Sequence, residues 1–325
     1  MMKGTARLMR NRAWLPAALL LVGVRGLPAR SYQGTGLVLK VSPERNEMLV
    51  SMQEIPGYMD AMVMPLQVQQ PRALRALLPG MMVEFTLIVN RDSAYAENIR
   101  VRPFESVEND PLGACRLTIL EKTLAGNNSA ARTLAVGERV PNFALFDQSG
   151  QRIALSKFAG QVVVVDFVYT RCPFPNFCFR LSDNLAQVQK RFAGQLGRDL
   201  ALLTVTLDVE HDHPEELAKY AGIWKANDAY WHFLTGQELE VRKVAGMFGI
   251  GYWQDEGLMT HSLHTVIIDR QGNLAANLEG NLFSARQLGD LVESVLNRTA
   301  GPPESQAADL SNGEPLSEKS GRPQE

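Results

Sequence analysis

Short runs in which apolar and polar residues alternate occupy the first folded part of the chain, residues 34–104. Alternation of this kind is typical of half-buried strands, and proline, glycine and asparagine turns separate the runs. The predicted strands are residues 36–41, 47–52, 62–68, 82–89 and 95–101, with a short helical insert at 71–78. Five short strands predict a small all-β domain, an OB-like barrel filled by its own side chains.

The pattern changes in residues 136–298, where longer apolar runs alternate with segments of helical period. Two runs rich in β-branched residues, 162–168 and 199–207, indicate strands buried on both faces of a sheet. Hairpins are predicted at 142–155 and 265–277, and helices after Cys178 and at 214–224, 238–248 and 284–296. Strands that alternate with helices and close in a hairpin predict an α/β domain with a thioredoxin-like fold.

The amino terminus, residues 1–30, has the three-part pattern of an export signal. A basic stretch precedes an apolar core at 13–24, and small residues follow near Ala29. The core is shorter than the ~20 residues of a comfortable membrane span, and Leu27 stands where cleavage prefers a small residue. We therefore expect an exported protein, with the segment either cleaved or kept as an anchor.

Composition narrows the range of functions. The formal net charge of −2 gives no electrostatic reason to expect nucleic-acid binding. Three cysteines are too few for a disulfide scaffold, and Cys115 lies alone in a predicted linker, residues 105–135. The tail at 299–325 has almost no large apolar residue and is predicted to be disordered. By contrast, five of the 12 methionines fall between Met48 and Met64, which is unusual for core packing alone.

The candidate chemistry lies at Cys172 and Cys178, directly after the buried strand 162–168. Open α/β sheets place their functional groups at the carboxyl ends of such strands, and the start of the following helix favours the thiolate form. Two thiolates suit a soft metal ion, and the same pair can equally form a disulfide. For an exported protein, a structural or redox disulfide is the default interpretation of a lone cysteine pair.

The methionine-rich segment IPGYMDAMVM, residues 55–64, resembles the metal-binding segment of CusF-like periplasmic copper proteins, which are small OB-fold barrels. In that family a histidine, two methionines and a tryptophan hold Cu(I) or Ag(I). Met62 and Met64 match the two methionines, Met52 stands at the histidine position, and the segment has no tryptophan. The resemblance implies an all-thioether copper site, and the alternative is that these methionines only fill the barrel.

Three segments of the second domain resemble the SCO/SenC family of thioredoxin-like copper proteins. They are residues 140–173, 206–220 and 261–272, and they occur in the family's order. The resemblance implies copper ligation by Cys172, Cys178 and His261, since His261 has the spacing of the family's ligand histidine to the next glycine turn. Two aspartates in the second segment, Asp208 and Asp212, are expected to orient the cysteine loop. One departure is that five residues separate the cysteines, where the family has three.

We therefore expect a copper-binding metallochaperone or thiol-redox protein, located in the periplasm or tethered to the outer face of the inner membrane. By resemblance, its partner would be a respiratory oxidase copper subunit or another periplasmic copper protein. One alternative is a thiol–disulfide oxidoreductase or thiol peroxidase in which Cys172 attacks and Cys178 resolves. No Cys-x-x-Cys motif is present, which argues against a general disulfide reductase. Another alternative is a copper-resistance or storage module without a specific client.

Overall fold

The computed structural model describes residues 30–90, 93–104, 132–255 and 257–298. The predicted export signal, most of the predicted linker with Cys115, and the predicted tail lie outside these residues. In the described part of the chain, no helix has both the length and the hydropathy needed to cross a membrane.

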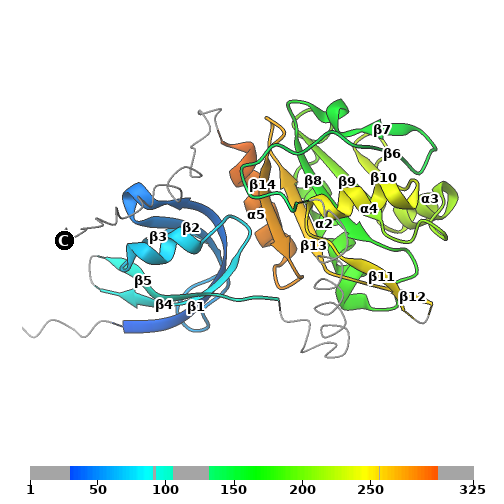
Figure 1. The fold of residues 1–325 in the computed structure, drawn as a ribbon. Coiled ribbons are helices and arrows are strands. Elements are labelled where there is room, and N and C mark those ends of the chain that lie inside the picture. The colour runs from blue at the N-terminus through cyan, green and yellow to red at the C-terminus, as the bar shows by residue number, and fades with distance from the viewer. Residues whose placement is uncertain (1–29, 91–92, 105–131, 256, 299–325) are drawn as a thin grey trace, which may run out of the picture.

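The first domain is a closed barrel of five strands (Figure 1). The strands are β1 (Arg30–Ser42), β2 (Glu47–Met52), β3 (Val63–Val68), β4 (Met82–Val89) and β5 (Ala94–Val101), in the order β1-β2-β3-β5-β4. Two short 3-10 helices, η1 (Pro43–Arg45) and η2 (Pro71–Ala76), lie between strands. All five predicted strands are present, and this barrel is compatible with the predicted OB-like architecture. Alternate residues of each strand point inward, and those that do are mostly apolar, so the barrel has an apolar interior.

The second domain is built on a five-stranded sheet in the order β10-β9-β8-β13-β14. These strands are β8 (Val162–Val168), β9 (Leu200–Thr206), β10 (Trp231–Leu234), β13 (His264–Ile268) and β14 (Leu274–Glu279). β8, β9 and β10 run parallel, whereas β13 is antiparallel to both β8 and β14. Every residue of β8 and β9 is buried, as the apolar runs predicted.

Helices cover both faces of this sheet. They are α2 (Arg180–Arg191), α3 (Pro214–Ile223), α4 (Glu238–Met247) and α5 (Ala285–Leu296). Apolar residues of α2, α3 and α5 pack on one face of the sheet, and those of α4 pack on the other. The predicted amino-terminal hairpin is present as β6 (Ala144–Phe146) and β7 (Arg152–Ala154), followed by the 3-10 helix η4 (Leu155–Phe158). A second hairpin, β11 (Tyr252–Asp255) and β12 (Leu258–His261), was not predicted from the sequence.

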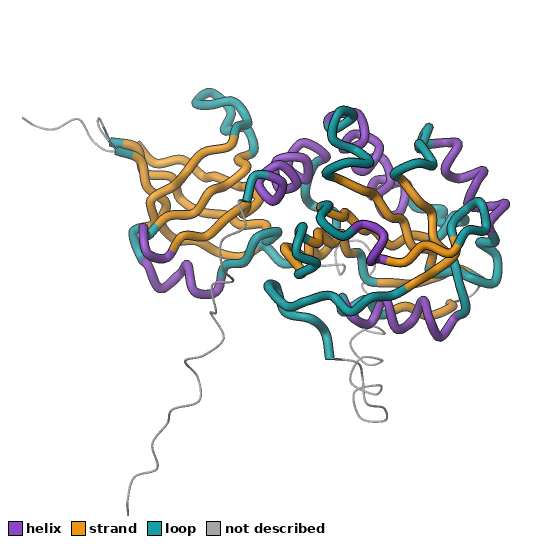
Figure 2. Tube along the Cα trace, turned by 90° about the horizontal axis from the view of Figure 1, so that it is seen from above, coloured by secondary structure: helices purple, strands orange, loops and turns teal. Residues whose placement is uncertain are grey.

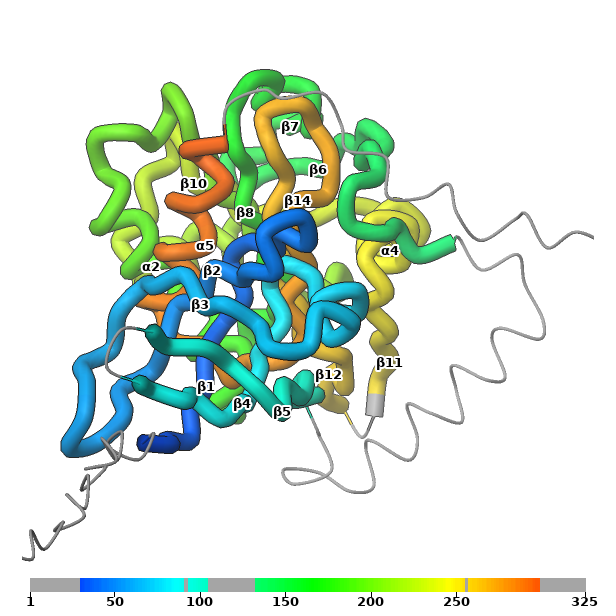
Figure 3. Tube along the Cα trace, turned by 90° about the vertical axis from the view of Figure 1, so that its left-hand side faces the viewer, coloured from blue at the N-terminus to red at the C-terminus, as the bar shows by residue number. Residues whose placement is uncertain are grey.

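The barrel packs directly against the second domain. In Figure 1, α5 and β14 lie on the side of the sheet that faces the barrel, and Figures 2 and 3 show the same arrangement from above and from the barrel's side. Leu37 and Leu39 of β1 and Met82 of β4 are buried in the same apolar cluster as α5. The two domains therefore share part of one core, which the sequence patterns did not predict.

Candidate metal centre

The two cysteines lie on the loop that connects β8 to α2. Cys172 follows the last residue of β8 by four positions and is half-buried. Cys178 lies in a wide π-helical turn, η5 (Pro175–Phe179), and is only 1% exposed. Within this turn Phe177 leaves the helical conformation, with φ −107° and ψ −108°. The kinked turn thus accommodates the five-residue spacing and places Cys178 two residues before the start of α2.

His261 reaches the cysteine loop from the end of β12. Its Nε2 lies 3.4 Å from Sγ of Cys178, and its Nδ1 lies 2.9 Å from the carbonyl oxygen of Ser262. Because a carbonyl oxygen only accepts, Nδ1 carries the proton and Nε2 presents its lone pair to the thiol. Desolvation lowers the pKa of His261 to about 4, so the imidazole is neutral at physiological pH. A neutral imidazole with a free Nε2 is the form that binds metal ions.

The two thiols have opposite acidities. A hydrogen bond donated by Cys178 is the main cause that lowers the pKa of Cys172 to about 6, and backbone N–H groups of Phe174 and Cys178 add to it. Burial raises the pKa of Cys178 well above its ordinary value, and the neighbouring Cys172 raises it further. Cys172 is therefore the thiolate at neutral pH, and Cys178 holds the shared proton.

Tyr169 is a part of this centre that the sequence analysis missed. Its side chain is buried, and its ring packs edge-on against that of His261, with 5.9 Å between the centroids. Burial raises the pKa of the Tyr169 hydroxyl, and so does the negative charge of the nearby Cys172 thiolate. The protonated hydroxyl donates a hydrogen bond to Cys172 and contributes to its lowered pKa. A tyrosine directly after a buried strand and three residues before Cys172 was the available sequence signal.

Two buried aspartates hold the base of the cysteine loop, as the sequence analysis expected. Asp212 accepts hydrogen bonds from the backbone N–H of Thr170 at 3.0 Å and from the Thr170 and Thr206 hydroxyls. Asp208 pairs with Arg171 at 2.6 Å and with Nδ1 of His211 at 2.8 Å. Burial opposes ionisation of Asp208, but the bonds from Arg171 and His211 hold its pKa below the ordinary value. The residues directly before Cys172 are thereby fixed to the end of β9.

The separation of the candidate ligands can be compared with that of ligands in known metal sites. A sulfur at about 2.3 Å and a nitrogen at about 2.0 Å from one tetrahedral ion, as in zinc sites, lie about 3.5 Å apart. Cys178 and His261 already have nearly this separation, at 3.4 Å. However, within the described ranges no three His, Cys, Asp or Glu side chains are gathered closely enough to hold an ion. A three-ligand site therefore requires the Cys172 end of the loop to move towards the Cys178–His261 pair.

The three methionines proposed as ligands lie on one side of the β2–β3 ribbon. Met64 is paired with Val50, and the backbone N–H of Met52 donates to the carbonyl oxygen of Met62 at 2.8 Å. Residues directly opposite each other, and residues two apart on one strand, share a face of a sheet. Met52 is fully buried, Met64 half-buried and Met62 49% exposed. This methionine face (Met52, Met62 and Met64) therefore runs from the barrel core to its surface.

Three buried polar residues of the domain lie outside the cysteine loop, and two of them act on its groups: Asp166 adds to the raised pKa of Cys178, and His264 adds to the lowered pKa of His261. Asp166 is fully buried in β8, and its carboxylate oxygens have no hydrogen-bond partner within 3.5 Å. Arg171, which follows β8 by three residues, pairs with Asp208. His232 is buried against Asp147 at 3.1 Å, and Nδ1 of His264 lies 2.8 Å from Asn277.

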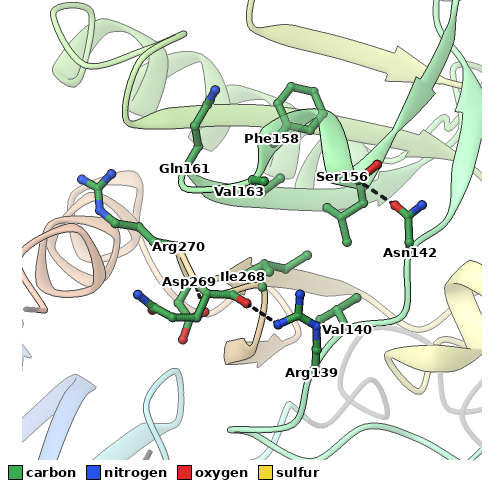
Figure 4. Close-up of a pocket in the computed structure, with 14 residues that line it drawn as sticks. Arg139, Val140, Asn142, Ser156, Phe158, Gln161, Val163, Ile268, Asp269 and Arg270 are labelled. Carbon is green, nitrogen blue, oxygen red and sulfur yellow. Dashed lines mark hydrogen bonds between the residues drawn. The ribbon is translucent and has the colours of Figure 1, made fainter. Parts of the chain in front are cut away.

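A cavity of about 240 Å³ lies at the opposite end of β8 from the cysteine loop (Figure 4). It is lined by residues around Arg139, Phe158, Val163 and Arg270, and it contains none of the predicted site residues. The candidate chemistry is therefore confined to the carboxyl end of β8 and to the barrel.

Several known proteins are similar in sequence to part of this chain. The chain is 28% identical over 107 residues to the SCO1 protein homolog of Bacillus subtilis (strain 168), covering 33% of this chain and 54% of that protein. It is 30% identical over 166 residues to a SCO2-like protein of Rickettsia typhi, covering 48% of this chain and 76% of the relative. The chain thus spans about half the length of the Bacillus relative.

Solved structures of similar fold cover the second domain. Yeast Sco1 with copper bound has a TM-score of 0.45 and 21% identity, and the match covers 53% of this chain and 96% of that one. BsSco, described as a member of the Sco family of cytochrome c oxidase assembly proteins with a disulfide switch, has a TM-score of 0.43 and 22% identity. That match covers 50% of this chain and 95% of the other.

A family model described as SCO1/SenC matches residues 132–297, about half of the chain. The match includes both cysteines, His261 and the two loop aspartates, and it ends one residue after the last helix of the domain. The predicted family resemblance of the second domain is thereby confirmed, and the barrel lies outside the matched range. Through its second domain, this chain belongs to the SCO1/SenC family.

Proposed function

We propose that this protein binds copper through Cys172, Cys178 and His261 and delivers it to a respiratory oxidase copper centre or another periplasmic copper protein. The observation that carries the proposal is the contact between Sγ of Cys178 and the unprotonated Nε2 of His261, at 3.4 Å. Thiolate ligands favour Cu(I), and imidazole also suits Cu(II), so this ligand set can follow either oxidation state. Copper is cargo here, and the protein must release it again.

Family membership supports the choice of metal and client. Yeast Sco1, to which the second domain is similar, has been solved with copper bound. BsSco is described as belonging to the cytochrome c oxidase assembly proteins. The client and the periplasmic location are parts of the proposal. The amino-terminal export pattern, which lies outside the described residues, supports that location.

A second candidate function, thiol–disulfide exchange, is favoured by the unequal acidity of the thiols. Cys172, with a pKa of about 6, is the attacking thiolate, and the buried Cys178 is the resolving thiol. In such a reaction Cys172 attacks a disulfide sulfur of the client, one client thiolate leaves, and Cys178 then displaces the second client sulfur. The client disulfide is reduced by two electrons while Cys172 and Cys178 are joined. Such a step would prepare a client's cysteines to receive copper.

The barrel is proposed to hold a second Cu(I) on its methionine face. The resemblance to CusF-like proteins supports this proposal, and so does the strand register that gathers Met52, Met62 and Met64 on one side. Thioether sulfur is a soft, neutral ligand, and these thioethers would select Cu(I) or Ag(I) over Zn(II) and Cu(II). Because no ligand proton is displaced, binding at this site should change little in mild acid.

Metal titration of the purified, reduced full chain tests the main site. We expect one equivalent of copper to be lost in Cys172→Ser or Cys178→Ser, and His261→Ala to weaken Cu(II) more than Cu(I). His213→Ala is the matched control, since His213 is an exposed histidine just before α3 and should leave both affinities unchanged. Unchanged copper binding in His261→Ala would show that the ligand set is wrong.

The oxidoreductase alternative is tested with the same protein. Copper should protect both thiols from alkylation and slow any reduction of disulfides, because coordinated thiolates are no longer free nucleophiles. Rapid turnover of a disulfide or peroxide substrate that copper does not inhibit would favour the enzyme instead.

For the barrel site, Met62→Leu with Met64→Leu conserves volume and should abolish the binding of Ag(I) while leaving the fold intact.

A further inference from the structure

We infer that the two copper sites act in sequence within one molecule: Cu(I) captured on the methionine face of the barrel passes to Cys172, Cys178 and His261 of the same chain. The inference rests on the proposed function, since it requires that both sites bind Cu(I). It goes further by assigning the barrel a role as the entry site and by making the transfer intramolecular. Three features of the structure support it: the way the barrel is docked, what the docking segment touches, and the difference between the two ligand sets.

The strand that carries Met52 is clamped to α5. The Ser51 hydroxyl donates to Asp290 at 2.7 Å, and the Gln287 side-chain amide donates to the Ser51 carbonyl at 3.0 Å. Arg286 donates to the carbonyl oxygen of Met52 itself. Ser51 and Gln287 are fully buried and Asp290 nearly so, so these are interior contacts of a fixed interface. The barrel is therefore held in one orientation on the second domain.

The segment that enters α5 also touches the metal centre. Asn281 donates to the carbonyl oxygen of Asn176, two residues before Cys178, and Arg180 donates to that of Phe283 at 3.2 Å. Five residue steps separate Asn281 from Arg286, so their Cα atoms lie at most about 18 Å apart. One short segment thus contacts both the cysteine turn and the backbone of Met52.

The barrel also rests on the edge of the metal centre through its last described residue. Phe104 packs on Gly280, where an added Cβ would lie only 2.2 Å from the phenylalanine ring. Gly280 has φ +79°, and its backbone N–H donates to the carbonyl oxygen of Leu263, two residues after His261. The barrel therefore meets the second domain beside both ligand-bearing segments, the cysteine turn and the end of the β12 hairpin.

The ligand sets give the transfer a direction. Cu(I) on the methionine face has neutral thioether ligands, whereas Cys172 and Cys178 supply anionic thiolates that hold a soft cation more strongly. Met62 is 49% exposed and open to incoming metal, whereas Cys178 is 1% exposed. Copper stays Cu(I) throughout, so no electron is transferred. The thioethers leave as neutral groups, and the proton displaced from Cys178 passes to solvent.

The test follows the filling of the thiolate site after rapid mixing of the reduced full chain with Cu(I) supplied as a weak chelate. Cu(I)–thiolate charge-transfer absorption reports the second site alone, since thioethers do not give that band. We expect a fast phase in the wild-type chain that is lost in Met62→Leu with Met64→Leu, although the equilibrium affinity of the thiolate site is unchanged. Met81, a half-buried barrel methionine directly before β4, lies outside the methionine face, and Met81→Leu is the matched control that should keep the fast phase.

Two further measurements separate transfer within one chain from transfer between chains. Arg286→Ala, which releases the Met52 carbonyl, should slow the fast phase without changing either affinity. Cu(I) loaded on a chain with Cys172→Ser and Cys178→Ser should reach the Met62→Leu, Met64→Leu chain only at a rate that rises with protein concentration.

The outcomes also distinguish this inference from the proposed function. Equal filling rates in the wild type and the methionine variant, or a methionine face that binds no Cu(I), would overturn the relay while leaving the thiolate site standing. Absence of copper from the thiolate site at equilibrium would overturn the proposed function itself. A fast phase that depends on protein concentration in the wild-type chain would show that transfer is intermolecular.

Discussion

At the residue scale, two thiols of one loop differ in what surrounds them. Cys172 is half-buried and receives hydrogen bonds from Cys178 and Tyr169, so its pKa is about 6, whereas burial keeps Cys178 protonated. Alkylation of Cys172 by iodoacetamide should therefore reach half its maximal rate near pH 6, while Cys178 stays unreactive at neutral pH. Cys178→Ala removes the main hydrogen-bond donor and should shift this midpoint upwards. Mass spectrometry of the alkylated peptides checks both statements, and equal labelling of the two thiols across pH would contradict them.

Asp166 illustrates the energetic consequence of burial for a single carboxyl group. Desolvation is the main cause that raises its pKa to about 7, so the folded protein keeps a proton that the unfolded chain loses near pH 4. Stability should consequently fall as pH rises from about 4 to about 7, because the folded state binds more protons over that range. The Asp166→Asn variant has no such proton. Its free energy of unfolding, compared with that of the wild type, should therefore rise by up to about 4 kcal/mol between pH 4 and pH 7. Urea unfolding at the two pH values measures this, and an equal effect at both would be inconsistent with it.

At the element scale, the sequence predicted those strands and helices that have a strong pattern. The runs at β8 and β9 are continuous and β-branched, and they are buried throughout. The β11–β12 hairpin was missed because its strands have only four residues each and mix apolar with polar side chains. Yet this hairpin delivers His261 to the cysteine loop. The spacing of His261 to the next glycine turn, which it shares with the SCO/SenC family, made this residue a candidate. The β11–β12 hairpin that positions it has no strong pattern in the sequence.

The geometry of the cysteine loop depends on contacts between elements that no local pattern reveals. Asp212, which follows β9, accepts bonds from Thr170 and Thr206 and fixes the end of β8. Asp212→Ala leaves these buried donors without a partner and should cost about 2 to 4 kcal/mol of stability. The loosened loop should also alkylate faster at Cys178. Asp183→Ala, an exposed carboxylate on α2, is the control and should change stability by less than about 0.5 kcal/mol. Similar unfolding midpoints for the two variants would show that Asp212 does not anchor the loop.

At the scale of the whole molecule, the contact between the domains could not be predicted because it joins residues far apart in the chain. Ser51 and Asp290 are separated by 239 positions, and neither belongs to a recognisable motif. Asp290 also pairs with Arg191 at 2.7 Å and with Arg286 at 3.3 Å, so one carboxylate joins β2, α2 and α5. The alternation of apolar and polar residues predicted which side chains of β2 point into the barrel. It did not predict that α5 packs on the outward face of β2.

Because the interface is buried and shares a core, the barrel and the second domain should unfold together. Tryptophan fluorescence reports the second domain, and far-UV circular dichroism reports both domains. We expect both signals to change in one transition when the full chain is unfolded in urea. Three of the four tryptophans, Trp224, Trp231 and Trp253, lie in the second domain, and Trp14 lies in the predicted export signal. Asp290→Ala breaks the links to Ser51, Arg191 and Arg286 and should separate the two transitions, with a cost of about 1.5 to 3 kcal/mol, because Asp290 is buried but both arginines are more than one third exposed.

Glu293→Ala is the matched control, since Glu293 bonds Arg191 at 2.6 Å but lies half-exposed at the rim, where an ion pair contributes about 1 kcal/mol or less. A double-mutant cycle between Ser51→Ala and Asp290→Ala isolates the contact between the domains and should give a coupling energy of about 1 to 3 kcal/mol. A coupling energy near zero, or two separate transitions already in the wild-type chain, would mean that the barrel folds and moves independently. Transfer of copper over a fixed interface would then lose its structural basis.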